Sequence, residues 1–204
     1  MKRTTHILAL TVGCVLVGTS ALVAGGGLKL QVKPWTWVGT VANDGVAGTP
    51  EAVTAAWLPG IGVTDHGLLL QKAAPTADWS AAGATIEGVA GIKLQKIGFD
   101  VQSGGHCGAG APRFNVVTDD NVTHFIGCSS PAPVSNDTIT DARGQTWERR
   151  AYDPAQAYPP IDANATVKSI NIVFDEGTDV GQGFVVLDNI TINDVVVGKP
   201  GAAF

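Results

Sequence analysis

Four acidic residues near the carboxyl end of the chain, Asp175, Glu176, Asp179 and Asp188, carry the chemistry of a calcium site. Carboxylate oxygens are hard ligands that suit Ca²⁺, and extracellular calcium is abundant enough to fill weak sites. The spacing of the four residues does not match the loop of an EF-hand. We therefore expect a structural calcium ion here on the basis of ligand chemistry and not of a motif.

Asp188 stands out because of the strand in which it is predicted to lie. With the period of two of a β-strand, Asp188 shares one face with Val186 and Ile190, which are both apolar. A buried, ionised carboxylate is costly unless a metal ion, a partner or hydrogen bonds compensate for it. Two interpretations therefore stay open: Asp188 is a calcium ligand, or it is accommodated by a local bulge or by backbone hydrogen bonds.

The stretch that begins at Trp147 has the chemistry of a sugar-binding surface, because an aromatic ring can stack on the apolar face of a pyranose. We expect Trp147, Arg149, Tyr152 and Tyr158 to be the ligand-binding residues of a long irregular connection, and such connections on a rigid sandwich often carry function. The alternative is that Trp147 anchors this loop to the core while Arg149 and Arg150 are solvated. The remaining tryptophans are Trp35, Trp37, Trp57 and Trp79.

The cysteines Cys107 and Cys128 are expected to form a disulfide. Glycine-rich chain follows Cys107, and the hairpin after it returns to Cys128, which brings the two sulfurs within reach. The alternative is a zinc site completed by His106 and His124. Adjacent ligands at positions 106 and 107 are poorly spaced for one tetrahedral ion, and an exported protein favours oxidation of its cysteines.

Sequence motifs for catalysis are absent. The chain has neither a Gly-x-Ser-x-Gly nucleophile elbow nor a His-Glu-x-x-His pair. Glycoside hydrolysis needs only two suitably spaced carboxylates, which the 18 acidic residues of the chain could supply. No catalytic residue is assigned.

The amino-terminal segment predicts export. Lys2 and Arg3 precede an apolar run over 7–17 and then small residues, which is the order of a secretory signal peptide. We expect a signal peptide over 1–26 and one secreted or extracellular domain over 27–204. The alternatives are a periplasmic protein or, because Cys14 follows a glycine, a lipid-anchored one.

The charge and the apolar pattern of the chain argue against two kinds of partner, nucleic acid and the membrane interior. The net charge of −5 argues against binding to nucleic acid, which needs a clustered basic footprint. No second apolar run approaches the length needed to span a bilayer, so the mature chain is not expected to insert into a membrane. A glycan or a surface component is the partner that we expect, and the oligomeric state is not predicted.

The elements that must position these residues are mostly strands. Alternating apolar residues over 28–33, 170–174 and 184–192, and a hairpin signal at 119–121 between 113–118 and 122–127, predict short antiparallel strands. A two-turn helix is expected over 50–58, where Pro50 follows Thr49. The fold class is therefore an all-β antiparallel β-sandwich of jelly-roll type, with a closed β-barrel as the alternative.

The closing strands resemble those of a known family. The segment 183–192, with Asp188 and Asn189 between aliphatic residues and an alternating strand over 169–174 before it, is similar to the end of galactose-binding-like jelly rolls of secreted carbohydrate-binding proteins. This resemblance implies a jelly roll, often with a structural calcium ion, and implies sugar binding more weakly.

We therefore expect a secreted, non-catalytic module that binds carbohydrate or a surface or matrix component. The alternatives are a hydrolase or lyase acting on glycans on the same scaffold, and a structural protein of an envelope or matrix. A shallow groove floored by tryptophan would favour binding, and a deep cleft holding two carboxylates would favour hydrolysis.

Overall fold

The chain folds into β-strands with one short 3₁₀ helix, η2, among the described residues. The computed structural model describes residues 29–38, 53–61, 66–73, 80–108, 110–128, 130–175 and 183–197, so the predicted signal peptide lies outside the described residues. The elements are β1 (Gln31–Trp37), β2 (Val53–Pro59), β3 (His66–Lys72), β4 (Ala81–Glu87), β5 (Ile97–Gln102), β6 (Arg113–Thr118), β7 (Thr123–Ile126), β8 (Thr138–Thr140), β9 (Thr146–Tyr152), η2 (Pro154–Gln156), β10 (Val167–Phe174), β11 (Gly183–Ile192) and β12 (Val195–Val197).

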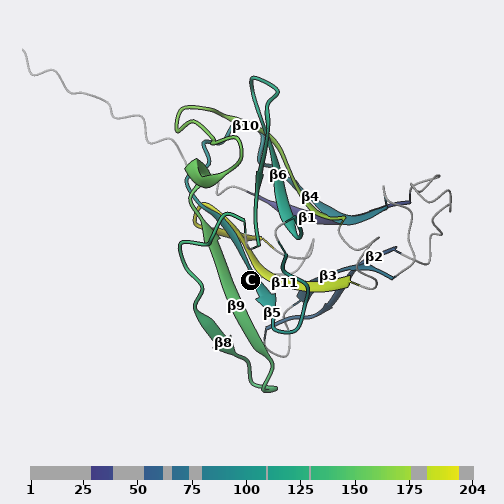
Figure 1. Ribbon diagram of the computed structural model, residues 1–204. Coiled ribbons are helices and arrows are strands. Elements are labelled where there is room, and N and C mark those ends of the chain that lie inside the picture. Colours follow the sequence, from purple (N-terminus) through teal and green to yellow (C-terminus); the bar gives the residue numbers. More distant parts are fainter. Residues whose placement is uncertain are drawn as a thin grey trace, which may run out of the picture.

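The strands form two antiparallel sheets that pack as a sandwich, which confirms the predicted fold class (Figure 1). The five-stranded sheet has the order β1-β4-β10-β6-β7, and the seven-stranded sheet has the order β2-β3-β11-β5-β9-β8 with β12 beside β11. Along the chain the described strands change sheet seven times: at β1–β2, β3–β4, β4–β5, β5–β6, β7–β8, β9–β10 and β10–β11. The described strands thus make two separate sheets and not one closed barrel.

The core lies between the two sheets and is built by the period of two along each strand. Inward residues of the five-stranded sheet include Ile86, Phe114 and Ile172, all of them fully or almost fully buried. Phe99 of β5 meets Phe114 with ring centroids 5.1 Å apart, which ties the sheets together through an aromatic contact. Each sheet therefore presents a second, outward face, and polar residues lie on these faces.

The predicted hairpin is confirmed, whereas the predicted helix is wrong. β6 and β7 pair in register from Phe114 opposite Ile126 to Val117 opposite Thr123, and Asn121 supplies the left-handed turn with φ of 65°. Within the described part of the segment 50–58, the chain is the strand β2, paired with β3. Its alternate residues Ala55 and Trp57 pack against the core, so burial with a period of two outweighs the helix-start signal.

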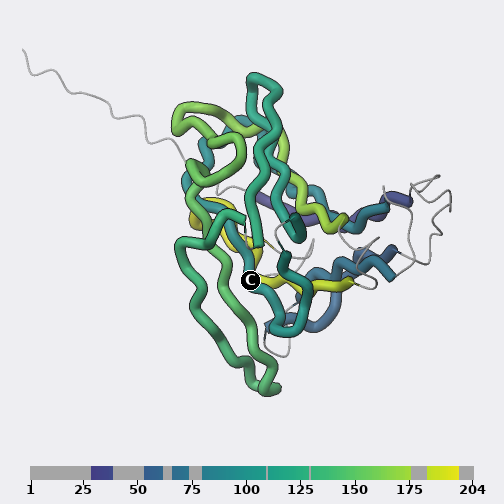
Figure 2. The backbone as a smooth tube through the Cα atoms, viewed as in Figure 1, coloured from purple at the N-terminus to yellow at the C-terminus, as the bar shows by residue number. Residues whose placement is uncertain are grey.

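Two hairpins extend from opposite ends of the sandwich (Figure 2). The β6–β7 hairpin lies at one end and the β8–β9 hairpin at the other. In the part of the chain that the structure describes, we find no helix with the length and apolar character needed to cross a bilayer.

Candidate functional site

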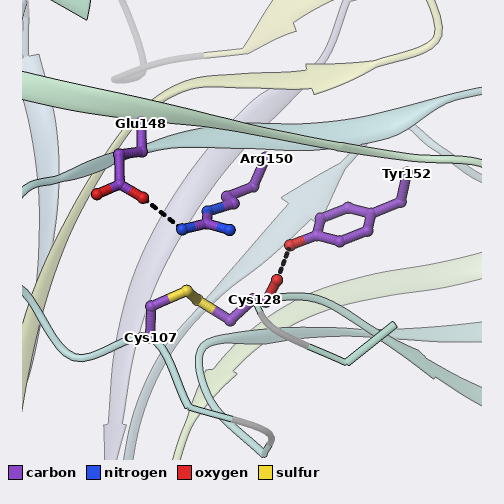
Figure 3. Close-up of a disulfide and its surroundings, with 5 residues drawn as sticks. All are labelled: Cys107, Cys128, Glu148, Arg150 and Tyr152. Atoms are coloured by element: carbon purple, nitrogen blue, oxygen red, sulfur yellow. Dashed lines mark hydrogen bonds and ion pairs between the residues drawn. A yellow bond between two sulfur atoms is a disulfide. The ribbon is translucent and has the colours of Figure 1, made fainter. Parts of the chain in front are cut away.

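The disulfide predicted between Cys107 and Cys128 is present, with 5.2 Å between the Cα atoms (Figure 3). The Tyr152 hydroxyl donates a hydrogen bond of 2.6 Å to the Cys128 carbonyl, so β9 holds this end of the bridge. The two histidines of the zinc alternative are engaged elsewhere. His106 packs edge-on against the Phe174 ring, and the His124 ring lies between the Thr118 hydroxyl and the Pro159 carbonyl.

Trp147 is a buried residue and not a ligand platform. The stretch predicted to be an irregular loop is the strand β9, and the Trp147 side chain has no exposed surface. Its indole Nε1 donates to Asp141 Oδ2 at 3.3 Å. Burial raises the pKa of Asp141, but hydrogen bonds from Arg143, Gln145 and Trp147 outweigh burial and hold that pKa at about 2. Trp147 is therefore buried, as the alternative interpretation expected, but it lies in a strand and not in a loop.

The other three predicted ligand-binding residues, Arg149, Tyr152 and Tyr158, lie in different parts of the structure. Tyr152 is buried against the core, and burial raises the pKa of its hydroxyl. Arg149 lies on the outer face of the seven-stranded sheet, where Nε and Nη2 donate to the buried Asp100 carboxylate at 3.0 and 3.2 Å. Tyr158 is 80% exposed and lies beside β7 at the edge of the five-stranded sheet. The four residues do not form one site.

Asp188 lies at a bulge that reverses the faces of β11. The register with β5 shifts between Asp188 and Thr191, and Asn189 adopts a positive φ of 44°. Val185 and Leu187 face the core before the shift, and Ile190 faces it afterwards. The simple period of two, which placed Asp188 in one row with Ile190, is therefore wrong across this point, and Asp188 faces outward with Val186.

The Asp188 carboxylate is nevertheless buried, and backbone groups hold it. Its Oδ2 accepts from the amide of Ile61, and its Oδ1 accepts from the amide of Asn189 at 2.6 Å. A side chain at Gly60 would collide with the carboxylate, so the 60–61 segment covers it closely. These contacts agree with the interpretation that backbone hydrogen bonds compensate for the burial of Asp188.

The four carboxylates of the predicted calcium site are not assembled by the part that the structure describes. Asp175 directly follows β10 of the five-stranded sheet, and Asp188 lies in β11 of the seven-stranded sheet. Glu176 and Asp179 lie outside the described residues. Among the residues that are described, no three acidic, histidine or cysteine side chains come together as a metal-binding group. Calcium binding stays a prediction from the sequence.

Replacing Asp188 by alanine tests which interaction stabilises it. We expect the free energy of unfolding to fall by about 1–3 kcal/mol, because two partly buried backbone amides lose their acceptor. Chemical denaturation of both proteins, each measured in calcium and in a chelator, checks this value. If hydrogen bonds alone stabilise Asp188, the wild type will be equally stable in calcium and in chelator. Chelator that destabilises the wild type but not the variant would instead identify Asp188 as a metal ligand.

A different surface combines aromatic and polar groups, namely the outer face of the five-stranded sheet. A shallow hollow of about 510 Å³ lies there, which we call the tryptophan groove. Its lining comprises Trp35, Thr36, Trp37, Ala81, Arg113, Asn115, Asn171, Val173 and Asp175. Trp35 and Trp37 are two residues apart on β1, so both indoles project from one face of the edge strand. Trp37 is 61% exposed, which is unusual for the largest side chain.

The floor of the tryptophan groove is kept low by a glycine. Gly83 on β4 lies directly opposite Trp35, and a Cβ atom there would collide with the Trp35 ring and with the Ile172 carbonyl. Glycine lets the indole lie over the neighbouring strand. Val173 and Ala81, both buried, continue this floor. The result is an open, flat surface with the tryptophans on one side.

Arg113 and Asp175 close the opposite side of the tryptophan groove as a bidentate ion pair. Arg113 Nη1 and Nη2 each donate to an Asp175 oxygen at 2.6 Å. The Arg113 side chain also donates to the Gly110 carbonyl and lies 5.7 Å from the centroid of the Phe125 ring. The Lys72 ammonium fixes the Asp175 backbone by donating to its carbonyl at 2.7 Å. Planar bidentate pairs of this kind are geometrically defined, so the two polar heads present a rigid edge.

Two carboxamides between these walls supply hydrogen-bond donors. Asn115 and Asn171 lie opposite each other on β6 and β10. The oxygen of Asn171 accepts from the Thr85 hydroxyl at 2.8 Å, and that of Asn115 accepts from Arg113 Nε at 3.1 Å. Because both oxygens are used within the protein, the two NH₂ groups remain as donors toward the groove, with no partner among the described residues.

The outer face of the seven-stranded sheet carries a second hollow, of about 350 Å³. Asp100, Arg149 and Asn189 meet there, and the Asn189 amide donates to Asp100 at 2.8 Å. The hydrogen bond from Arg149 to Asp100 raises the pKa of the guanidinium. These groups satisfy one another, and the described lining offers neither tryptophan nor tyrosine. The tryptophan groove therefore has the richer recognition chemistry.

The sequence contains one signal for the tryptophan groove, the alternation along β1. The alternation predicted over 28–33 places Lys29, Gln31 and Lys33 on the outer face. Continued by four residues, the same alternation places Trp35 and Trp37 on that face. The contribution of Arg113, Asn115 and Asn171 depends on β10 lying between β4 and β6, a pairing of distant segments that local patterns do not encode.

Comparison with known proteins gives no assignment: no family model matches the chain, and no curated protein or solved structure is significantly similar to it.

Proposed function

We propose that this chain is a secreted, non-catalytic module that binds carbohydrate in the tryptophan groove. The observation that carries the proposal is the pair of outward indoles, Trp35 and Trp37, beside two amide donors and a fixed Arg113–Asp175 pair on one open sheet face. A pyranose has apolar C–H faces that stack on an indole, and a rim of hydroxyls that bonds to amide and guanidinium groups. The groove offers both kinds of contact side by side.

Several features favour binding over glycan cleavage. The tryptophan groove is open and shallow, and Asp175 is the one carboxylate in its described lining. Both Asp175 oxygens already accept from Arg113. A glycosidase of the common kind needs two carboxyl groups on either side of the scissile bond. Binding therefore accounts for the groove with fewer added assumptions.

Secretion is supported by two independent features. The amino-terminal segment has the order of a signal peptide, with Lys2 and Arg3 before an apolar run. The Cys107–Cys128 disulfide is the kind of bond that persists in oxidising compartments. Extracellular polysaccharides are met in the same compartment, so the location and the groove chemistry agree.

Substitution of Trp37 by alanine tests the proposal. The probes are soluble neutral polysaccharides, namely β-glucan, xyloglucan and galactomannan, examined by affinity electrophoresis and calorimetry. At least one polymer should bind the wild type, and Trp37→Ala should weaken that binding roughly tenfold or more, as expected for an exposed aromatic anchor. Because Trp37 is largely exposed, the variant should keep its stability.

The matched control is Phe184→Ala, which removes another exposed aromatic ring, on the outer face of the seven-stranded sheet. This variant should bind like the wild type. A turnover assay with the same polymers runs in parallel and should show no release of reducing ends. Equal loss in both variants would contradict the assigned groove, and turnover by the wild type would contradict a non-catalytic role.

A further inference from the structure

A smaller hollow on the five-stranded sheet lies beside the tryptophan groove, on the other side of Arg113. It has a volume of about 260 Å³, and its lining includes Arg113, Phe125, Ser130, Pro131, Gln156 and Tyr158. Arg113 lines both hollows, so they meet at its guanidinium. The Phe125 ring is 40% exposed and lies under that guanidinium. The outer face thus carries aromatic side chains at both ends and polar groups between them.

Tyr158 is held at the far end by the backbone. Its amide and carbonyl exchange hydrogen bonds of 2.9 and 2.8 Å with Phe125, which adds a single bridge beyond the edge strand β7. The following residue is fixed because the His124 ring bonds to the Pro159 carbonyl at 2.7 Å. Directly opposed residues of an antiparallel pair project to the same side. The exposed Tyr158 ring therefore lies on the same face as Phe125 and the tryptophan groove.

The dimensions of this face suit a chain of sugars and not a single ring. Strands in a sheet lie about 4.8 Å apart, so the path from β1 across β4, β10 and β6 to β7 is roughly 19 Å long, and the Tyr158 bridge extends it further. Several consecutive pyranose rings fit along such a path. The rings at the two ends would meet aromatic side chains, and the central rings would meet Asn171, Asn115 and Arg113.

The charge of the combined surface identifies the kind of chain. Arg113 and Asp175 are the charged residues among the described lining of both hollows, and they neutralise each other at 2.6 Å. An anionic glycan would find no uncompensated cation along this path in the described lining. A neutral glycan needs only stacking and hydrogen bonds, which the surface supplies.

On this basis we propose that the ligand is a neutral oligosaccharide stretch of several sugar rings, lying across the strands from Trp35 and Trp37 to Phe125 and Tyr158. This inference rests on the proposed function and specifies its ligand. It makes Tyr158 an end contact that short ligands do not reach. The same reasoning makes Trp37 a contact needed by ligands of every length.

A chain-length series tests the inference. Calorimetry with gluco- and manno-oligosaccharides, from disaccharide to hexasaccharide, should show affinity rising to at least the tetrasaccharide. Tyr158→Ala should lower affinity severalfold for the longest ligands and leave the shortest unchanged, whereas Trp37→Ala should weaken all of them. Tyr158→Phe, which keeps the ring, should behave like the wild type. Raising the salt concentration should leave the affinity unchanged, and a uronate polymer should bind no better than a neutral one.

The possible results separate the two proposals. If no carbohydrate binds the wild type, the proposed function fails. If carbohydrate binds but affinity levels off at the disaccharide, or Tyr158→Ala has no effect on long ligands, the groove is a short site and the extended path is wrong. Salt-sensitive binding that favours a uronate polymer would overturn the assignment of a neutral ligand.

Discussion

Replacing Trp147 by alanine should lower the free energy of unfolding by roughly 3–5 kcal/mol, the range for removing a large aromatic side chain from a packed interior. The indole has no exposed surface, and its Nε1 bonds to the buried Asp141 carboxylate. The loss arises from the cavity and from the acceptor left without this donor. Urea denaturation followed by circular dichroism measures the change.

A second variant keeps this prediction testable if the alanine protein does not fold. Trp147→Phe retains most of the volume and should destabilise less than alanine. Both folded variants should bind polysaccharide with the affinity of the wild type, because Trp147 is not part of the tryptophan groove. A stable Trp147 variant that no longer binds polysaccharide would instead identify Trp147 as a ligand-binding residue, as predicted from the sequence.

Removal of the Cys107–Cys128 disulfide should lower the free energy of unfolding by about 3 kcal/mol, because the bridge closes a loop with a sequence separation of 21. The unfolded chain without the bridge gains conformational freedom that the native chain does not have. The double variant Cys107→Ala/Cys128→Ala, compared with the wild type by denaturant titration, measures the effect. A loss of this size is a large share of the stability of a typical domain.

Tyr152→Phe is the matched control for the disulfide. It removes the hydroxyl that bonds to the Cys128 carbonyl but leaves the bridge intact, so it should cost about 1 kcal/mol. Alkylation of unreduced, denatured protein should label neither Cys107 nor Cys128. Full labelling of both, or a double variant as stable as the wild type, would contradict a bridge that stabilises the domain.

The all-β class and the β6–β7 hairpin could be predicted because they follow from short-range patterns. Apolar alternation and the Asp-Asp-Asn turn predict the β6–β7 hairpin. The hairpin lies between Cys107 and Cys128, so its return brings the two cysteines together. The failures share one cause. The segment at Pro50 and the row through Asp188 were interpreted with local rules, whereas pairing with β3 decided the first and a bulge opposite β5 decided the second.

The candidate site was harder to predict than the fold. Its walls come from β1, β4, β6 and β10, and their order in the sheet depends on contacts between distant parts of the chain. Trp147 is predicted from the sequence to be a ligand-binding residue because the stretch that begins with it looks like a long irregular connection. In β9, Arg149 pairs with Asp100, Arg150 pairs with Glu148, and the buried Trp147 indole donates to Asp141. These positions depend on the pairing of β9 with β5, which local patterns do not encode.

Titration of the isotope-labelled protein with a bound polysaccharide fragment, followed by NMR of the indole and side-chain amide groups, tests the central claim most directly. The claim predicts that the indole signals of Trp35 and Trp37 and the amide signals of Asn115 and Asn171 shift with ligand, while the Trp147 indole signal stays in place. Shifts confined to the side-chain amides of Asn189 and Asn193, in the hollow of the seven-stranded sheet, would contradict it.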